Sequence, residues 1–407
     1  MRGKGAERPG SRRWTWVALA AGLVTALSIP LLGVAAARTL GDSKAGKLDV
    51  PTGTVGVVSA DTPGALLVAK DGNDVIGLTV LALQPSGAGG TAVVVPVGSE
   101  ATVDGFDRPT RLANAYQKGG LDAEATATEG LLGVTFSTEQ EVDRDGLLAL
   151  LAPLGSITVT LSDPVLRTGA NGQDEQVLPG GRQTITAQQA VSALYARRAN
   201  ESEILRTPAQ VAIWQGIVQA AQTVAKEADT AQPPATVAGY LGALGAGPRA
   251  VRTLDVTPAL DVVTNPDAID LLQVDSASTQ LLMARILPTA VSPTNGGLRV
   301  RLRNQTGDNS ALYQATVRLL FAGANVVAVD DTPSAGVSVG TRLEYDPSLT
   351  QDRIEGLTVA IGPASAAPAK ARVDGVDVTV DLGQDFLAFL KKGTSSGGDV
   401  PPTAGGG

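Results

Sequence analysis

The 407-residue sequence contains no histidine and no cysteine. These two absences exclude a Ser-His-Asp triad, a thiolate nucleophile, a disulfide, and a zinc site built from cysteine or histidine. Any chemistry must therefore use carboxylates, arginine, lysine, tyrosine, hydroxyl groups, or a metal ion held by oxygen ligands. The paired and alternating charged residues of the chain are the candidates that remain.

Each of these charged groupings has an ordinary structural interpretation beside a functional one. Glu203 and Arg206 are three residues apart, so on a helix they could form a surface pair worth about 0.2–0.5 kcal/mol. Arg197 and its neighbour Arg198 end a predicted helix, where the helix dipole favours a cation even without a ligand. Three arginines alternate along a predicted strand and favour a solvated face over a phosphate site: Arg299, Arg301 and Arg303.

The composition indicates a folded, acidic protein. Hydrophobic residues make up 43% of the chain and charged residues 18%, so most of it should fold. Aromatic residues are only 3%, so the cores must consist mainly of Val, Leu, Ala and Ile. A formal net charge of −8 argues against nucleic acid as a partner.

The amino end predicts a membrane anchor. Residues 1–13 form a basic tail, and residues 14–37 are 24 residues without a charge, long enough to cross a hydrocarbon core of about 30 Å. The positive-inside rule places the tail in the cytoplasm and the bulk of the chain outside, in a single-pass protein of the cell membrane. The alternative is a cleaved signal peptide, because Val34 to Ala37 are small residues at a usable cleavage position.

A polar stalk is expected at 38–54. Beyond it, the alternation of strand-like and helix-like segments predicts a three-layer α/β domain with a mixed sheet over residues 55–290. Its expected strands are 55–58, 65–69, 75–83, 91–96 and 156–161, and its expected helices are 121–132, 145–154, 186–198 and 206–226. Thr184 or Thr186 is expected to cap the third helix, and Pro208 to lie in the first turn of the fourth. Residues 228–248 are expected to be a loop or a weakly packed helical extension.

A second, smaller α/β domain is predicted at 297–388. Strands are expected at 298–303, 326–329, 341–345 and 375–382, with helices at 309–322 and 348–355. Residues 393–407 consist largely of Gly, Ser, Thr and Pro, and we expect them to be disordered.

The order of short motifs in the chain resembles that of the LytR-CpsA-Psr (LCP) family. In the first domain the resemblance rests on Asn73-Asp74-Val-Ile76, Val95-Pro96, Arg111-Leu-Ala-Asn-Ala-Tyr116 with Gly119-Gly120, and Leu178-Pro-Gly-Gly-Arg-Gln183. In the second domain, Val300-Arg-Leu-Arg-Asn-Gln-Thr-Gly307 and Val376 to Gly383 resemble a LytR C-terminal domain. Each motif alone is weak, and their common order in one anchored chain carries the resemblance.

The resemblance implies a phosphotransferase that moves a glycopolymer from a polyprenyl-pyrophosphate carrier to a peptidoglycan hydroxyl. Such chemistry needs arginines for the pyrophosphate, an apolar slot for the prenyl tail and, where the enzyme is active, carboxylates for Mg²⁺ or Mn²⁺. Carried over by motif, the pyrophosphate-binding candidates are Arg111, Arg197 and Arg206, the carboxylate candidates are Asp74 (also the metal candidate) and Glu203, and the lipid-slot candidates are Val211, Trp214 and Val218.

The chain departs from the family pattern where the pattern is most diagnostic. The Ile-Pro-Arg-Asp signature of the family reads Val95-Pro96-Val97-Gly98 here, so both the arginine and the acid are missing. The second acid of the metal-binding strand is also missing, because residues 82–84 are Ala-Leu-Gln. Losing these charges together is expected to cost on the order of 10³ or more in rate.

Ordinary roles remain open for the carried-over residues. In the ordinary interpretation Asp74, which follows a Gly-Asn turn, is only a turn carboxylate. In the same interpretation Arg111 is a loop residue beside Pro109, and the apolar stripe of the fourth helix belongs to the hydrophobic core.

Three functions are open. We expect an envelope-assembly protein that binds a polyprenyl-linked glycopolymer precursor with weak or no transferase activity. The alternatives are an active phosphotransferase with rearranged acids, Asp104 or Asp107 among them, and a non-catalytic envelope interaction protein. The Ala, Gly, Val and Arg bias, together with the family, indicates an actinobacterial envelope.

Overall fold

A computed structural model describes residues 61–226, 232–260, 265, 269–293, 296–330 and 337–395. The chain divides into two compact units, Met1–Val55 and Gly56–Gly407, and every described residue belongs to the second. The predicted tail 1–13, anchor 14–37, stalk 38–54 and strand 55–58 lie outside the described residues. Among the residues that are described, no helix combines the length and the apolar character needed to cross a membrane.

The first sheet is mixed, as predicted. β1 pairs with β2 and β2 with β3 in antiparallel fashion, while the outer strands β11 and β6 run parallel to β3 and β1. In spatial order the strands are β11 (Arg249–Thr253), β3 (Gly90–Val95), β2 (Asp74–Leu83), β1 (Gly64–Asp71) and β6 (Thr138–Val142). Three of the five strands match the predicted ones at 65–69, 75–83 and 91–96.

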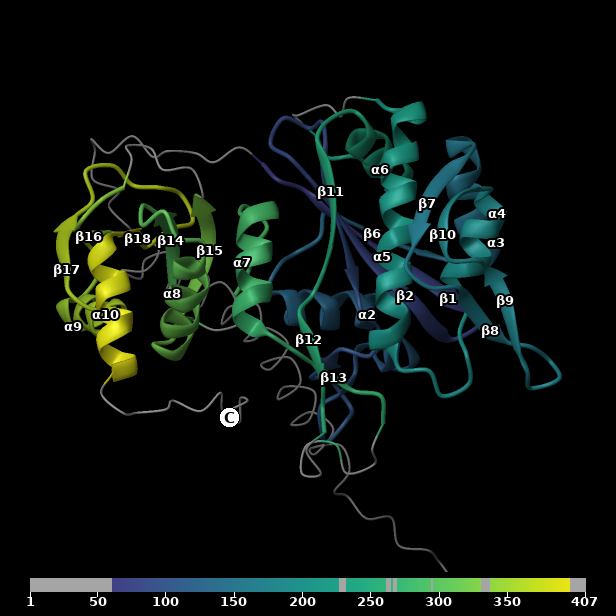
Figure 1. The fold of residues 1–407 in the computed structure, drawn as a ribbon. Coiled ribbons are helices and arrows are strands. Elements are labelled where there is room, and N and C mark those ends of the chain that lie inside the picture. The colour runs from purple at the N-terminus through teal and green to yellow at the C-terminus, as the bar shows by residue number, and fades with distance from the viewer. Residues whose placement is uncertain are drawn as a thin grey trace, which may run out of the picture. The chain divides into compact units, whose positions relative to one another are not determined.

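Helices cover both faces of this sheet, so the predicted three layers are present (Figure 1). Successive residues of β1 alternate between two buried clusters, because neighbouring side chains of a strand point to opposite faces: Leu67 joins one cluster and Leu66 the other. The Leu67 face packs against α3 (Arg144–Leu151), α4 (Ala187–Leu194), α5 (Glu203–Ala220) and α6 (Val237–Gly245). The Leu66 face packs against α2 (Tyr116–Leu132) and α7 (Ser276–Ile286).

Small two-stranded pairs border these layers. They are β7 (Ile157–Leu161) with β10 (Gly181–Ile185), β8 (Val165–Thr168) with β9 (Asp174–Leu178), β12 (Val256–Pro258) with β13 (Leu272–Val274), and β4 (Glu100–Ala101) with β5 (Thr110–Arg111). Short 3₁₀ helices lie at Leu112–Asn114, Ala152–Leu154 and Ala221–Val224.

Several predicted helix boundaries are wrong. Thr186 caps α4 in a capping box with Gln189, as expected, but α4 ends at Leu194, so Arg197 and Arg198 lie beyond the helix rather than in its last turn. α5 begins at Glu203, which places Pro208 inside the helix instead of in its first turn. The stretch 228–248, predicted as a loop or weak extension, contains α6, whose Tyr240 is fully buried.

A second five-stranded sheet forms a separate α/β arrangement. Its order is β15 (Ala324–Asp330), β14 (Leu298–Asn304), β18 (Val378–Leu382), β16 (Thr341–Tyr345) and β17 (Ala364–Pro368), and only the β16–β18 pair is antiparallel among these pairs. Its helices are α8 (Ser310–Phe321), α9 (Gln351–Ile361) and α10 (Gln384–Ser395). The predicted helix 348–355 lies three residues later than expected, β17 was not predicted, and α10 extends into the expected tail.

Candidate functional site

Two of the candidate residues, Glu203 and Arg206, form a buried ion pair rather than the expected surface pair. The Arg206 Nη1 group donates to Glu203 Oε2 at 2.6 Å, and the two side chains are 6% and 0% exposed. Arg206 also donates to the carbonyl oxygens of Leu194 and Ala196, both at 3.2 Å. Arg206 therefore ties the first turn of α5 to the end of α4, and its three nitrogens are engaged within the protein.

Arg111 and Arg197 are the two arginines of the site that remain available to a ligand. Arg111 ends β5 and is half-buried, and its Nε is buried without a hydrogen-bond partner. Burial lowers the pKa of Arg111, and the like charge of Arg197 lowers it further. Arg197 is more open, with 38% of its side chain exposed, and its Nη2 donates to the Glu201 carbonyl oxygen at 3.0 Å. Arg111 and Arg197 therefore belong to one group of interacting charges.

A carboxylate that sequence reasoning missed completes this cluster. Asp270 Oδ1 accepts a hydrogen bond from Ser202 Oγ at 2.6 Å, and Asp270 Oδ2 accepts from the Glu203 backbone N–H at 2.8 Å. Its Oδ2 also lies 3.7 Å from Arg197 Nη2. No local sequence signal marks Asp270, because it meets α5 only through the tertiary fold, 67 residues from Glu203. The cluster thus contains three arginines and two carboxylates: Arg111, Arg197, Arg206, Glu203 and Asp270.

Of the two positions that depart from the family signature, Gly98 lies against this cluster and Val97 is a core residue. Val97 is 1% exposed and belongs to the core on the α2 face of the sheet. A Cβ atom added at Gly98 would lie 3.1 Å from the Asp270 carbonyl oxygen and 3.4 Å from Glu203 Cβ. The backbone of Asp270 and the side chain of Glu203 therefore occupy the space that a longer residue at position 98 would need.

Asp74 has a hydrogen-bond partner outside the arginine cluster. It is exposed, it begins β2 directly after the hairpin turn at Gly72, and its Oδ1 accepts from Gln117 Nε2 at 3.3 Å. Within the described part of the chain, no group of three acidic side chains is placed to hold a metal ion. Asp74 is therefore not part of such a group.

Beside Asp74, the same end of the sheet holds a hydrogen-bonded Lys–Tyr–Glu group. Lys70 Nζ donates to Tyr116 Oη at 2.7 Å and to Glu141 Oε1 at 3.0 Å, and Tyr116 Oη donates to Glu141 Oε2 at 2.6 Å. Hydrogen bonds to Tyr116 and Glu141 raise the pKa of Lys70 and keep its side chain protonated. A protonated ammonium group cannot act as a nucleophile. This group joins β1, β6 and the start of α2 and is a structural tie.

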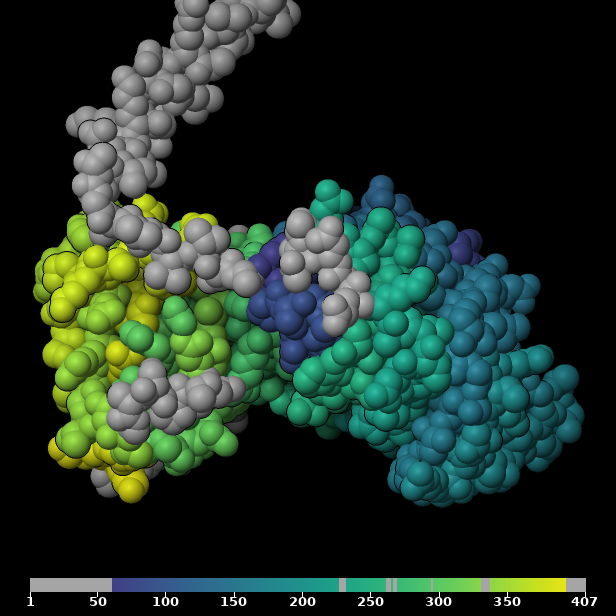
Figure 2. All heavy atoms as spheres, turned by 90° about the horizontal axis from the view of Figure 1, so that it is seen from above, coloured from purple at the N-terminus to yellow at the C-terminus, as the bar shows by residue number. Residues whose placement is uncertain are grey.

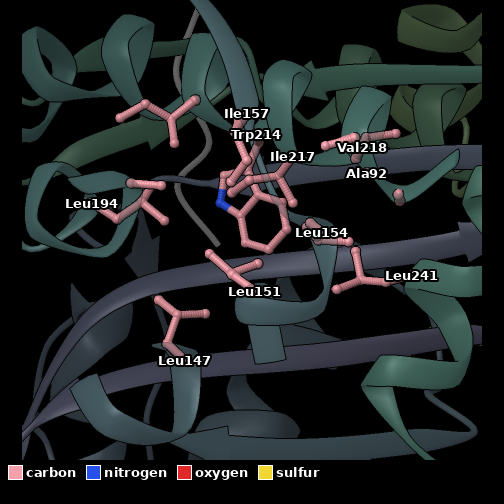
Figure 3. Packing of buried hydrophobic residues seen from close by; sticks show 14 of the residues in the cluster. Ala92, Leu147, Leu151, Leu154, Ile157, Leu194, Trp214, Ile217, Val218 and Leu241 are labelled. Atoms are coloured by element: carbon pink, nitrogen blue, oxygen red, sulfur yellow. The ribbon is translucent and has the colours of Figure 1, made fainter. Parts of the chain in front are cut away.

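The lipid-slot candidates are core residues. Trp214 and Val218 are 4% and 2% exposed, and Val211 packs against the same cluster. The indole of Trp214 lies among Leu151, Leu154 and Ile217 (Figure 3). Figure 2 shows the teal atoms of the first domain on one face of the molecule, and no deep hollow is visible among them on that face.

A small cavity remains between the sheet and helices α4 and α5. Its volume is about 20 Å³, and Trp214, Leu194, Gln210 and Tyr195 contribute to its lining. This volume admits roughly one water molecule, whereas pockets for drug-sized ligands measure about 300–1,000 Å³. The cavity as it stands has no room for an isoprenoid chain.

The alternating arginines of β14 are ion-paired, in agreement with the structural interpretation of that strand. Arg299 contacts Asp377, Arg301 contacts Asp330, and Arg303 contacts Asp381 and Glu344. Their charges are therefore compensated within the second sheet.

Comparison with known proteins gives matches at the level of structure. No family model and no curated protein matches the sequence. Solved structures that match include LCP proteins, the family that the motifs resemble: B. subtilis TagT (15% identity, TM-score 0.41, 55% of this chain and 88% of that chain) and a LytR-Csp2A-Psr enzyme from Actinomyces oris (16%, 0.39, 56% and 94%). A third is YwtF (TagT) with bound octaprenyl pyrophosphate lipid (16%, 0.40, 54% and 86%). Other matches are described as transcription regulators. Function must be inferred from this chain's own residues, because identities are below 25% and TM-scores below 0.5.

Proposed function

We propose that this chain is a membrane-anchored, extracytoplasmic LCP-like protein of cell-envelope assembly. In this proposal it binds the phosphate groups of a polyprenyl-linked glycopolymer precursor and has weak or no transferase activity. The observation that carries the proposal is the Arg111–Arg197 pair, in which one guanidinium has a buried Nε without a partner. Two neighbouring guanidinium groups repel each other, and an anion between them relieves that repulsion and supplies the missing acceptor.

The surroundings of the pair support binding without transfer. Phosphoryl transfer needs groups that stabilise charge developing in the transition state, commonly a cation held by carboxylates. The buried Val97 and the closely packed Gly98 leave no arginine or acid there, and the hydrogen-bond partner of Asp74, Gln117, is outside the cluster. We therefore derive no step through Mg²⁺ or Mn²⁺ in this chain.

The tight interior supports recognition of the head group rather than the tail. A cavity of about 20 Å³ beneath Trp214 leaves the prenyl chain outside the protein. In this proposal affinity comes from charge-assisted hydrogen bonds to phosphate oxygens, worth about 1.5–3 kcal/mol each. The tail of the carrier lipid then stays in the bilayer that the proposed anchor at 14–37 shares with it, and peptidoglycan is the neighbouring wall polymer.

The proposal is tested by titrating the full-length protein, in detergent micelles, with inorganic pyrophosphate by isothermal titration calorimetry. Arg111→Ala and Arg197→Ala should each weaken binding about tenfold or more, the equivalent of one lost charge-assisted contact. Arg167→Ala is the matched control, because Arg167 forms an exposed ion pair with Glu175 on β8 and β9. Equal binding by all four proteins would remove the basis of the proposal.

An enzymatic assay separates this proposal from the alternative of an active ligase. The wild-type protein, a polyprenyl-pyrophosphate glycolipid, peptidoglycan and Mg²⁺ or Mn²⁺ are incubated together, and the release of polyprenyl monophosphate, the leaving group of the transfer, is measured. We expect no release above background. Steady release that Arg197→Ala abolishes would establish the ligase instead.

A further inference from the structure

Asp270 places a negative charge at the start of a long helix from a distant part of the chain. α5 has 18 residues, and the backbone N–H groups of its first turn lack acceptors within the helix. The Asp270 carboxylate accepts from the N–H group of Glu203 and from the hydroxyl group of Ser202, the N-cap residue. A helix start with free N–H groups and a positive dipole end is the position where phosphate groups bind in many proteins.

The same carboxylate faces the arginine pair. Its Oδ2 is 3.7 Å from Arg197 Nη2, and its charge counteracts the lowering of the Arg111 pKa caused by burial and by Arg197. Its side chain is 24% exposed, so solvent and solutes reach it. Asp270 thus shares its positive partners with the anion site proposed above.

Charge balance gives this arrangement a functional meaning. With Asp270 ionised, the cluster of three arginines and two carboxylates carries one net positive charge; without it, the cluster carries two. A ligand with a single negative charge gains little by replacing a tethered carboxylate. A pyrophosphate, with several negative oxygens, can engage both guanidinium groups and still compete for the helix start.

We infer that Asp270 is a built-in competing anion that sets the affinity of the Arg111–Arg197 site and selects for multiply charged phosphate ligands. The inference rests on the proposed function, because it concerns the same site. Removal of the charge at position 270 is expected to strengthen pyrophosphate binding, whereas a purely structural cap would make its removal neutral or harmful to binding.

The test compares wild-type protein with Asp270→Asn, both full-length in detergent micelles, by calorimetric titration with inorganic pyrophosphate and with nitrate, a singly charged anion. Asparagine keeps the size and one acceptor oxygen but removes the charge. Asp270→Asn should bind pyrophosphate about tenfold or more tightly than wild type, and Arg197→Ala in the same background should cancel the gain. Selectivity for pyrophosphate over nitrate should fall in the variant.

Two further proteins keep the test decisive. Asp143→Asn is the matched control: Asp143 also caps a helix, accepting from Gly146 N–H at 2.8 Å, and pyrophosphate affinity should not change. Ser202→Ala removes the hydrogen bond from the Ser202 hydroxyl group to Asp270 and should strengthen pyrophosphate binding by a few-fold. This variant tests the inference if Asp270→Asn fails to fold. Circular dichroism of each protein reports its folding.

The outcomes separate this inference from the proposed function. Binding by Asp270→Asn alone supports the inference and overturns pyrophosphate binding by the wild type. Equal or weaker binding by a folded Asp270→Asn overturns the inference and leaves the proposed function standing. Absence of binding in both proteins overturns both.

Discussion

A buried carboxyl group on α2 gives a prediction that tests the packing of the first domain. Glu124 is 0% exposed; its Oε2 accepts from the Tyr116 backbone N–H at 3.0 Å, and its Oε1 is buried without a partner. Burial raises its pKa from an ordinary 4.5 to about 8, against the opposing effect of the Tyr116 hydrogen bond. The folded protein therefore holds this proton at neutral pH, while the unfolded chain releases it.

The sign of the effect on stability follows from linkage. Below about pH 4.5 both states are protonated and Glu124 costs nothing; between pH 4.5 and about 8 only the unfolded state ionises, so stability falls as pH rises. The loss amounts to about 1 kcal/mol at pH 5 and about 3 kcal/mol at pH 7, at about 1.4 kcal/mol per pH unit. Glu124→Gln keeps an oxygen for the Tyr116 N–H group and removes the ionisation, so it should stabilise the protein by about those amounts.

The measurement is urea unfolding of wild type and Glu124→Gln at pH 5, 6, 7 and 8, followed by circular dichroism. The difference between the two proteins should grow with pH and level off near pH 8. Asp122→Asn is the control, because Asp122 lies on the same helix but is exposed. A Glu124→Gln effect that is independent of pH, or a variant that is less stable at pH 8, would refute the reasoning.

Three other substitutions probe the site and its support. Trp214→Ala should lower the free energy of unfolding by about 3–5 kcal/mol in urea titrations, because it leaves a cavity in the core where a side chain only 4% exposed was packed. A loss below about 1 kcal/mol would indicate that the surroundings of Trp214 are loosely packed. Arg206→Ala should cost about 3–5 kcal/mol, measured in the same way, because it leaves the buried Glu203 carboxylate unpaired; a neutral result would mean that Glu203 is solvated. Val97→Arg should lower the thermal unfolding midpoint and fail to create transferase activity, because position 97 is 1% exposed; a stable variant that releases polyprenyl monophosphate from the glycolipid would contradict this.

Much of the fold could be predicted from local patterns. The alternating and continuous apolar runs at 65–69, 75–83 and 91–96 predicted three strands, because β-propensity and burial act together in a covered sheet. Thr184 or Thr186 was expected to cap the third helix, and Thr186 caps α4 in a capping box with Gln189. Periodicity did not reveal α6, because its Ala- and Gly-rich sequence reads as a loop and its burial comes from tertiary packing.

The site was harder to predict because its groups meet through the tertiary fold. Motif order indicated Arg111, Arg197, Glu203 and Arg206, and the structure brings these four together. The spacing of Glu203 and Arg206 suggested a surface pair, whereas burial of α5 makes it an internal one. Asp270 could not be found, because nothing in the local sequence distinguishes it from its neighbours Asp267 and Asp275 until the chain folds.

The central claim is that phosphate groups bind at Arg111 and Arg197 while the interior beneath Trp214 stays closed to the lipid tail. It is tested most directly by comparing the affinities of inorganic pyrophosphate and of dimethylallyl, geranyl and farnesyl pyrophosphate for the same protein. The account predicts affinities within about threefold of one another, since each buried CH₂ group would otherwise add about 0.8 kcal/mol. A steep gain in affinity with each added isoprene unit would contradict it.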